Sequence, residues 1–324
     1  MPDVVCLRPE ADFTRVGVNP PAALSVEYMA PDAPQLSDTM RAAKALVIPA
    51  VGPKLPLDLF RDTSIGLVQV TGAGVDRVDV AGLRDLSIAV ANVPGGSNEA
   101  IAEYATSSAA ILLRRMTEST HAIRAGNYAD FRSAYVKAGV DELDGRSVGV
   151  IGLGTIGKAV ARRFRAAGGT ILFHDPAPVA EADIAALGAE RAELDDLLAR
   201  ADVVTVHVPL LPATENLIDA RRLALMKPGA ILVQAARGGI VNEPALAAAL
   251  ESGHLAGAAV DVYTTEPPPN DHPLLTLSAA AAARVILTPH IAGVTRQSWA
   301  TLFREAWDNV LNVVKEGQAP RNVI

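Results

Sequence analysis

Residues 147–289 alternate short apolar runs with helical stretches rich in Ala and Leu, and this alternation constrains the fold more than any other feature of the sequence. The runs are rich in β-branched residues and apolar on both faces, which is typical of parallel strands covered by helices on both sides. They are SVGVI, TILFH, VVTVHV, AILVQAA, GAAVDV and RVILTP. Because strands and helices alternate, we predict a doubly wound α/β domain with a parallel sheet.

The sequence outside this region predicts a second domain. At 324 residues the chain is about twice the common domain size. The first hundred residues also alternate, although less regularly and with many prolines, and ALVIPA and IGLVQV are their clearest strands. Residues 295–316 carry apolar side chains at helical spacing and predict one helix. We expect residues 1–98 and 292–324 to form one domain, into which residues 99–291 are inserted as the other.

Composition narrows the class of protein. The net charge is −7 and no basic stripe with interleaved aromatic residues appears, so nucleic acid is not an expected partner. No apolar stretch reaches the ~18–20 residues of a membrane helix, and Asp3 and Arg8 interrupt what would be a secretory signal. Cys6 is the only cysteine, and we interpret it as a buried strand residue. We therefore expect a soluble cytoplasmic protein.

A glycine-rich turn follows the first strand of the inserted region. In GLGTIG the residues Gly152, Gly154 and Gly157 have GxGxxG spacing and lead directly into a helical stretch. Such glycines allow a tight turn, close approach of a pyrophosphate and close helix–strand packing, while the helix N-terminus attracts phosphate. Asp175 ends the next strand, where a carboxylate can bind ribose hydroxyls and repel the extra phosphate of NADP. The pattern predicts an NAD site; the alternative is a glycine-rich turn beside a surface Asp.

Three polar residues follow three of the predicted strands. Arg237 comes after AILVQAA, Glu266 after GAAVDVY and His290 after RVILTP. Because residues beyond the carboxyl ends of parallel strands converge at one edge of the sheet, we expect the three to meet there. A histidine can donate a proton near neutral pH, a carboxylate can orient its ring, and a guanidinium can hold a substrate carboxylate. The set suits reduction of a 2-oxo acid; a structural ion-pair network is the alternative.

Taken together, these segments resemble the D-isomer-specific 2-hydroxyacid dehydrogenase family, which includes phosphoglycerate dehydrogenases and glyoxylate/hydroxypyruvate reductases. The matching segments, which cover most of the chain from Thr71 to Gly293, are TGAGVDRVD, NEAIAEYA, LDGRSVGVIGLGTIGKAVARRF, HVPLLPAT, MKPGAILVQAARGGIVNEPAL, AVDVYTTEP, DHPLL and TPHIAG. The resemblance implies an NAD-binding Rossmann domain inserted into a flavodoxin-like substrate domain, both doubly wound with parallel sheets. It also implies a homodimer formed through the NAD-binding domain.

The resemblance assigns the chemistry to residues of this chain. It implies that Arg237 binds the substrate carboxylate, that Glu266 orients the histidine and that His290 is the acid/base. The loop Gly72–Asp76 would offer backbone N–H groups to the same carboxylate. The substrate-binding residues implied are Ala73, Gly74, Val75 and Arg237.

The cofactor-binding residues also follow from the resemblance. It places Asp261 near the nicotinamide amide and His207 near the adenine end of the cofactor, where we expect His207 to line the pocket rather than do chemistry. The full implied set is Gly152, Gly154, Thr155, Ile156, Gly157, Asp175, His207, Pro209, Thr214, Ala235 and Asp261.

The sequence departs from the family pattern at two places. Gln234-Ala235 stands where Asn-Thr or Asn-Ser commonly precedes Ala-Arg-Gly, and Asn242 stands where Asp commonly follows Gly-Gly-x-Val. Both lie at the edges of a motif, so they bear on substrate placement and not on the type of reaction.

The remaining histidines carry no predicted chemistry. We interpret His174 as a strand-end residue and His121, His254 and His272 as surface residues. Because no pair of histidines has the spacing of metal ligands, we predict no metal site.

Other functions on this scaffold remain as alternatives. Some relatives are NAD-sensing transcriptional corepressors, which carry additional peptide-binding and disordered segments that this chain does not show. Others oxidise formate or phosphite, but formate enzymes are usually longer and no second cation is placed for phosphite. The loop PAVGPKLP has Lys54 as its only cation, which predicts a small, unphosphorylated substrate unless a dimer partner supplies a residue such as Arg132.

Overall fold

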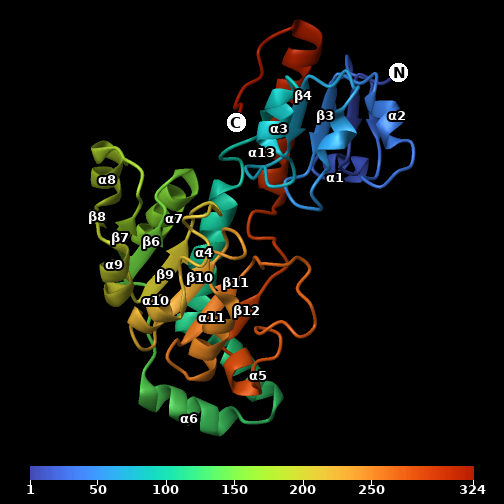
Figure 1. Cartoon of the computed structure of the whole chain (residues 1–324). Coiled ribbons are helices and arrows are strands. Elements are labelled where there is room, and N and C mark those ends of the chain that lie inside the picture. Colours follow the sequence, from blue (N-terminus) through green and yellow to red (C-terminus); the bar gives the residue numbers. More distant parts are fainter. The chain divides into compact units, whose positions relative to one another are not determined.

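The computed structural model describes all residues from Met1 to Ile324. The chain divides into two compact units, and the residues of each can be followed in Figure 1 by the colours that mark the sequence. Unit 1 comprises Met1–Ser97 and Val294–Ile324, and unit 2 comprises Asn98–Gly293. Both contain a parallel sheet with helices on its faces, which confirms the predicted fold class. No helix combines the length and the apolar character that crossing a membrane requires.

Unit 1 is built on a five-stranded parallel sheet in the order β2-β1-β3-β4-β5. Its strands are β1 (Val4–Cys6), β2 (Val26–Tyr28), β3 (Ala45–Ile48), β4 (Leu67–Val70) and β5 (Ala89–Ala91). Successive residues of β3 face opposite cores, with Leu46 and Ile48 in one and Ala45 and Val47 in the other. Its helical segments are α1 (Glu10–Thr14), α2 (Leu36–Met40), the 3₁₀ helix η1 (Leu57–Phe60), α3 (Val80–Asp85) and α13 (Arg296–Glu316).

The last helix, α13, covers one face of this sheet. The ring centroids of Phe303 and Trp307 lie 4.5 and 5.3 Å from that of Phe13, and all three side chains are buried. Thr295 and Ser298 form a capping box at the start of the helix, and Gly317 ends it in the left-handed conformation. The single helix predicted for residues 295–316 is thus confirmed, with Thr295 as its N-cap.

Unit 2 is built on a seven-stranded parallel sheet in the order β12-β11-β10-β9-β6-β7-β8. The strands are β6 (Ser147–Ile151), β7 (Thr170–His174), β8 (Ala189–Arg191), β9 (Val203–Val206), β10 (Ile231–Gln234), β11 (Gly257–Val260) and β12 (Val285–Leu287). The helices are α4 (Asn98–Leu113), α5 (Met116–Arg124), α6 (Tyr128–Ala138), α7 (Thr155–Ala166), α8 (Glu181–Leu187), α9 (Leu194–Arg200), α10 (Ala220–Leu225), α11 (Glu243–Glu251) and α12 (Ala279–Ala282).

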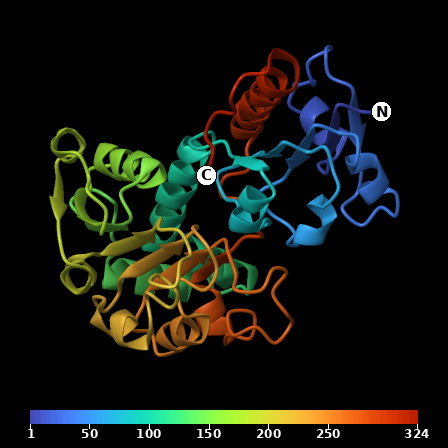
Figure 2. The ribbon, with the colours of Figure 1, turned by 45° about the horizontal axis from the view of Figure 1, so that its top comes forward.

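Both faces of this sheet are covered, as the doubly apolar strand pattern predicts. On β10, Leu232 belongs to the core beneath α9–α11, whereas Ile231 and Val233 belong to the core beneath α4 and α7. Figure 2 shows helices on either side of the sheet of unit 2. The six predicted strands correspond to β6, β7, β9, β10, β11 and β12, and the short edge strand β8 was not predicted.

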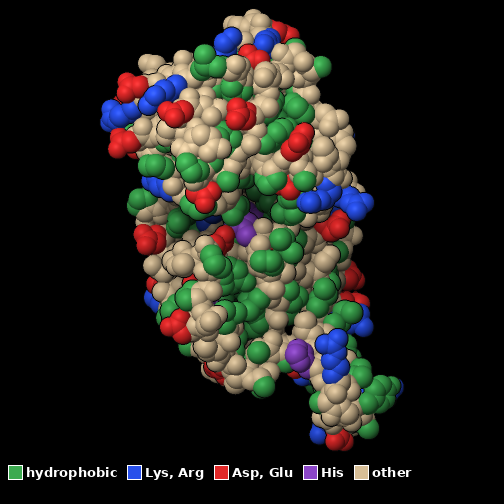
Figure 3. All heavy atoms as spheres, turned by 90° about the vertical axis from the view of Figure 1, so that its right-hand side faces the viewer, with side chains coloured by type: hydrophobic (Ala, Val, Ile, Leu, Met, Phe, Trp, Pro, Cys, Tyr) green, Lys and Arg blue, Asp and Glu red, His purple; other side chains and the backbone are tan.

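Helices α5 and α6 form an arm that projects from unit 2 (Figure 1). Neither helix has a buried residue. Large apolar side chains are exposed along them, namely Met116, Ile123, Tyr128 and Val136. Figure 3 shows hydrophobic side chains on the projection at the bottom of the view. The arm therefore presents an apolar surface that unit 2 itself does not cover.

Candidate active site

The glycine-rich turn has the geometry of a dinucleotide cradle. Gly152 adopts φ +91°, and a Cβ on Gly157 would lie 2.0 Å from the Gly152 oxygen, so α7 packs tightly on the turn. Nothing lies within 4 Å of the position that a Cβ on Gly154 would occupy. No side chain caps α7 at Gly154, so the first N–H groups of a twelve-residue helix face an open approach. These features fit a pyrophosphate.

Asp175 lies beside this turn at the end of β7. Its Oδ2 accepts from the Leu153 N–H at 2.7 Å, and its Oδ1 accepts from Ala177 N–H at 2.9 Å. The carboxylate is thus held next to the glycines, where it suits the ribose hydroxyls. Arg191, which the sequence analysis did not connect with this place, donates from Nη1 to the Asp175 carbonyl at 2.8 Å.

Arg237, Glu266 and His290 follow three neighbouring strands. Strands β10, β11 and β12 are adjacent and parallel, so the segments beyond them lie along one edge of the sheet. A Cβ on Gly238 would lie 2.0 Å from the backbone of Tyr263, so the Arg237 turn packs directly against the segment that leads to Glu266. The structure therefore brings the three predicted residues to the same edge.

His290 and Glu266 form a direct pair. His290 Nδ1 lies 2.8 Å from Glu266 Oε2, and the other carboxylate oxygen of Glu266 accepts from Tyr263 N–H at 3.1 Å. The two side chains are about a quarter exposed, at 25% and 28%. Since Nδ1 is engaged by the carboxylate, Nε2 is the nitrogen left to meet a substrate.

A buried network holds the backbone that carries His290. Asp261 is 1% exposed, and its carboxylate accepts from Thr288 Oγ1, Ile291 N–H and Ala292 N–H at 2.6–2.8 Å. His290 adopts φ +55°, and its N–H donates to the Asp261 carbonyl at 2.8 Å. The hydrogen bonds to Asp261 therefore hold His290 in this strained backbone conformation.

Tyr104 extends the network from α4. Its hydroxyl lies 2.8 Å from Thr288 Oγ1, which itself donates to Asp261. Because Thr288 uses its own proton on Asp261, Tyr104 is the donor to Thr288. Burial raises the pKa of Tyr104 to about 12, so the phenol keeps its proton at neutral pH.

Gln234 organises the turn that carries Arg237. Its Nε2 donates to the Arg237 carbonyl at 2.8 Å, and its Oε1 accepts from Ala236 N–H at 3.3 Å. The side chain is 2% exposed. Gln234, which departs from the family pattern, is therefore a positioning residue for the Arg237 turn. The sequence alone shows it only as an unusual residue near Arg237.

The other residues that the resemblance assigned to the cofactor lie at the same edge of unit 2. Thr155 and Ile156 begin α7, Pro209 and Thr214 follow β9, and Ala235 follows β10. Thr214 Oγ1 donates to the Pro209 carbonyl at 2.6 Å and so fixes the loop after β9.

His207 also follows β9, and its ring is neutral. Its Nε2 lies 2.7 Å from Thr205 Oγ1, while Nδ1 is buried without a partner. Burial lowers the pKa of His207 to about 3, so this histidine does not exchange protons near neutral pH. The environment agrees with a pocket-lining residue.

The interpretation of His272 as a surface residue was wrong. His272 is 6% exposed, and its Nε2 lies 2.9 Å from Glu243 Oε2. The ring also packs edge-on against Tyr263. The sequence DHPLL does not indicate this burial. The burial arises from the way the long segment between β11 and β12 folds.

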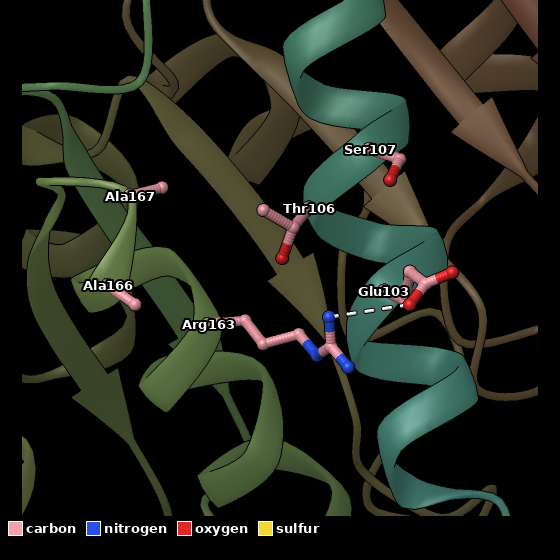
Figure 4. A pocket seen from close by; sticks show the side chains of 6 residues that line it. All are labelled: Glu103, Thr106, Ser107, Arg163, Ala166 and Ala167. Carbon is pink, nitrogen blue, oxygen red and sulfur yellow. Dashed lines mark ion pairs between the residues drawn. The ribbon is translucent and has the colours of Figure 1, made fainter.

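A shallow cavity between α4 and α7 is separate from these residues (Figure 4). It is lined by Glu103, Thr106, Ser107, Arg163, Ala166 and Ala167. Arg163 pairs with Glu103 at 3.4 Å across it. The α7 residues belong to the end of the helix opposite the glycine turn, so this cavity is not the cofactor site.

The substrate loop predicted in unit 1 follows β4. Asn92 Nδ2 donates to the Ala73 carbonyl at 2.7 Å, and Val93 N–H donates to the Gly72 carbonyl at 2.9 Å. The N–H groups of Ala73, Gly74 and Val75 donate to no acceptor within the protein. The loop carbonyls are therefore tied back while its amides remain able to bind an anion.

A second cation approaches the loop after β3 from outside it. Lys54 is the only cation within PAVGPKLP, but the guanidinium of Arg77 lies against this loop and donates to the Pro49 and Pro53 carbonyls. Arg77 lies more than twenty residues further along the chain, so the loop sequence alone did not show it.

Comparison with known proteins identifies the family of this chain. Residues 107–292 match the family model of the D-isomer specific 2-hydroxyacid dehydrogenase NAD binding domain. The chain is 39% identical over 268 residues to a D-3-phosphoglycerate dehydrogenase of Mycobacterium leprae, covering 83% of this chain and 48% of that protein. It is 41% identical over 256 residues to an (S)-sulfolactate dehydrogenase of Chromohalobacter salexigens, covering 79% and 78%. The structure of the TT0316 protein from Thermus thermophilus matches with TM-score 0.83 and 31% identity over 99% of each chain.

This chain belongs to the D-isomer specific 2-hydroxyacid dehydrogenase family. The matched residues are the family's NAD-binding domain, which confirms the predicted cofactor. The chain spans about half the length of the D-3-phosphoglycerate dehydrogenases that it matches.

Proposed function

We propose that this protein is an NAD-dependent oxidoreductase that interconverts a small 2-oxo acid and the corresponding D-2-hydroxy acid. The observation that carries the proposal is the His290–Glu266 pair, 2.8 Å apart at the strand ends beside the Arg237 turn. Family membership and the dinucleotide cradle support it. Residues 99–291 would serve as the NAD-binding domain, and residues 1–98 with 292–324 as the substrate domain.

His290 acts as the acid/base in this proposal. Glu266 holds Nδ1 and stabilises the imidazolium, so Nε2 can donate a proton to the oxygen at C2 during reduction and remove it during oxidation. NAD, when bound, supplies or accepts the hydride. Asp261, Thr288 and Tyr104 keep the His290 turn in place.

The substrate carboxylate is the second recognition element. Arg237 would bind it with the planar fork of its guanidinium, and the free N–H groups of Ala73, Gly74 and Val75 would contribute from unit 1. Gln234 sets the backbone from which Arg237 extends. The names of the relatives indicate acids with different substituents. Family membership therefore does not identify the group on C3 of the substrate.

The cofactor residues proposed for NAD are those of the glycine turn, the strand ends and the loop after β9. Gly152, Gly154, Thr155, Ile156 and Gly157 would hold the pyrophosphate, and Asp175 the adenosine ribose. The nicotinamide and adenine ends would be bordered by His207, Pro209, Thr214, Ala235 and Asp261.

We further propose that the protein is a cytoplasmic homodimer that associates through the NAD-binding domain. The exposed apolar side chains of the α5–α6 arm support this, because a surface of that kind is commonly covered by a partner. A second copy of the chain would provide that cover and exclude water from the arm.

The reaction is tested by following NADH at 340 nm with a panel of 2-oxo acids. We expect oxidation of NADH with at least one acid of two to four carbons, and a D-hydroxy acid as the product. Formate or phosphite with NAD serves as the comparison. Turnover with formate or phosphite alone, or NADH binding without turnover of any acid, would contradict the proposal.

A further inference from the structure

Glu243 lies at the start of α11 and binds two parts of the long segment between β11 and β12. Its Oε1 accepts from Thr264 N–H at 2.7 Å, and its Oε2 lies 2.9 Å from His272 Nε2. The side chains of Glu243 and His272 are both almost completely buried. Each oxygen of this carboxylate is thus committed to a different part of the same segment.

Hydrogen bonds fix the tautomer of the His272 ring. Leu274 N–H donates to Nδ1 at 3.3 Å, so Nδ1 is an acceptor and the ring proton is on Nε2. Nε2–H therefore donates to Glu243 Oε2. The His272 carbonyl closes the turn that follows by accepting from Leu275 N–H at 2.8 Å. The ring therefore connects this turn to α11.

The backbone at Tyr263 and Thr264 carries the contacts that place Glu266. Tyr263 N–H donates to Glu266 Oε1 at 3.1 Å, and Thr264 N–H donates to Glu243 at 2.7 Å. The turn at Gly238 rests on the same stretch, because a Cβ on Gly238 would overlap the Tyr263 carbonyl and the Thr264 nitrogen. A shift of this backbone would therefore move Glu266.

The Tyr263 side chain connects His272 with the strand end that precedes His290. Its ring packs edge-on against the His272 ring, with the centroids 5.7 Å apart. Its hydroxyl donates to the Thr288 carbonyl at 3.1 Å. Burial raises the pKa of Tyr263 to about 12, so the hydroxyl keeps the proton that this hydrogen bond needs.

We propose that Glu243 and His272 are positioning residues that hold Glu266 against Nδ1 of His290. This inference rests on the proposed reductase function and adds two residues that act on its acid/base pair. Glu243 fixes the backbone two residues before Glu266, and the free end of Glu266 then reaches His290 at 2.8 Å. His272 keeps the Glu243 carboxylate in this orientation by donating to its second oxygen.

The geometry requires a carboxylate at position 243, because both of its oxygens accept hydrogen bonds. A glutamine there could accept from Thr264 N–H, but its amide group would then face the Nε2–H of His272, donor against donor. A buried donor without an acceptor is costly, so the segment would shift to relieve the conflict. The shift would carry Glu266 away from His290.

The experiment measures the pH profile of NADH-dependent reduction of the best 2-oxo acid. Reduction requires the protonated form of His290, which Glu266 stabilises. Glu243→Gln should therefore move the alkaline limb of the profile to lower pH, as Glu266→Gln does. It should lower kcat by about tenfold and change KM for the acid by less than about threefold.

A double variant separates an action through Glu266 from general support of the fold. If Glu243 acts through Glu266, its loss has little left to disturb once Glu266 is replaced. Adding Glu243→Gln to Glu266→Gln should then lower kcat by less than about threefold and leave the alkaline limb in place.

Two substitutions of His272 test the hydrogen bond that holds Glu243. His272→Gln keeps a donor for the carboxylate and should retain kcat within about threefold of the unaltered protein. His272→Phe keeps a ring against Tyr263 but has no donor, so it should reproduce the kinetics of Glu243→Gln. If Glu243→Gln does not fold, His272→Phe carries the same test.

Glu251→Gln is the matched control, because Glu251 lies on the same helix and also holds the segment between β11 and β12. Its Oε1 accepts from Ser278 N–H at 2.6 Å and its Oε2 from Ser278 Oγ at 2.7 Å. This contact is exposed and lies well beyond Glu266 in the chain. Glu251→Gln should change kcat by less than about threefold and leave the pH profile unchanged. Thermal unfolding and NADH binding of each variant check the fold.

The position of Glu266 can also be observed without turnover. In a crystal structure of Glu243→Gln, Glu266 Oε2 should lie beyond hydrogen-bond distance, about 3.5 Å, of His290 Nδ1. The inference is overturned if the pair is unchanged in that structure, or if Glu243→Gln leaves kcat or the alkaline limb near normal. It is also overturned if the loss is mainly in KM, or is equally large in the Glu266→Gln background. In those cases the reductase function stands, whereas an unaltered protein that reduces no 2-oxo acid contradicts the proposed function itself.

Discussion

Asp175 couples the glycine turn to the choice of cofactor. Its carboxylate accepts hydrogen bonds from the Leu153 and Ala177 N–H groups, which hold it beside the expected ribose. The Arg191 side chain donates a hydrogen bond to the backbone carbonyl of Asp175. The Arg191 guanidinium therefore lies beside the residue that carries this carboxylate.

We predict a strong preference of the unaltered protein for NADH over NADPH, measured as the ratio of kcat/KM values. Asp175→Ser should reduce this ratio by about 100-fold, because it removes the repelling charge and leaves Arg191 near the 2′-phosphate. Adding Arg191→Ala to that variant should remove most of the gain with NADPH. Equal use of both cofactors by the unaltered protein would contradict the assignment.

At the scale of the elements, the turn after β10 sets the distance between Arg237 and the segment that carries Glu266. Gly238 allows this turn to lie on the Tyr263 backbone, and Tyr263 N–H in turn holds Glu266. We predict that Gly238→Ala lowers kcat/KM by about 100-fold, because displacement of Arg237 by about 1 Å is costly.

The same substitution should also destabilise the protein by about 1–3 kcal/mol through overpacking, as measured by denaturant unfolding. Gly66→Ala is the control, since nothing lies closer than 4.0 Å to its added Cβ; it should change stability by less than about 0.5 kcal/mol. Normal activity of Gly238→Ala would show that the turn does not position Arg237.

Elements with a strong period were predictable, and contacts between distant segments were not. The apolar runs gave β6, β7, β9, β10, β11 and β12, and the strand ends gave Arg237, Glu266 and His290. The edge strand β8 reads AER and buries no residue, so it has no apolar signal. Arg77, Arg191 and the His272–Glu243 pair depend on which loops the sheet order brings together, and spacing along one sequence does not contain that information.

For the whole molecule, the arm of α5 and α6 determines the expected assembly. Val136 is 64% exposed and Tyr128 61%, which is unusual for an apolar surface left in water. We predict a dimer at micromolar concentration by sedimentation equilibrium. Val136→Asp together with Tyr128→Asp should weaken association by at least about tenfold, because burying unpaired carboxylates is costly.

An exposed residue outside the arm provides the control for this prediction. Leu225→Asp introduces the same charge on α10 and should leave the dimer intact. A monomeric unaltered protein would contradict the assembly, as would a double variant that associates normally.

The most direct test of the account is the turnover number of His290→Asn with NADH and the best 2-oxo acid. Asparagine is polar but cannot transfer the proton, so kcat should fall by about 10²–10⁴-fold while NADH binding by fluorescence titration stays within about threefold. Glu266→Gln should show a smaller loss, because the ring keeps a hydrogen-bond partner but loses the charge that stabilises its protonated form. Near-normal turnover by His290→Asn would contradict the account.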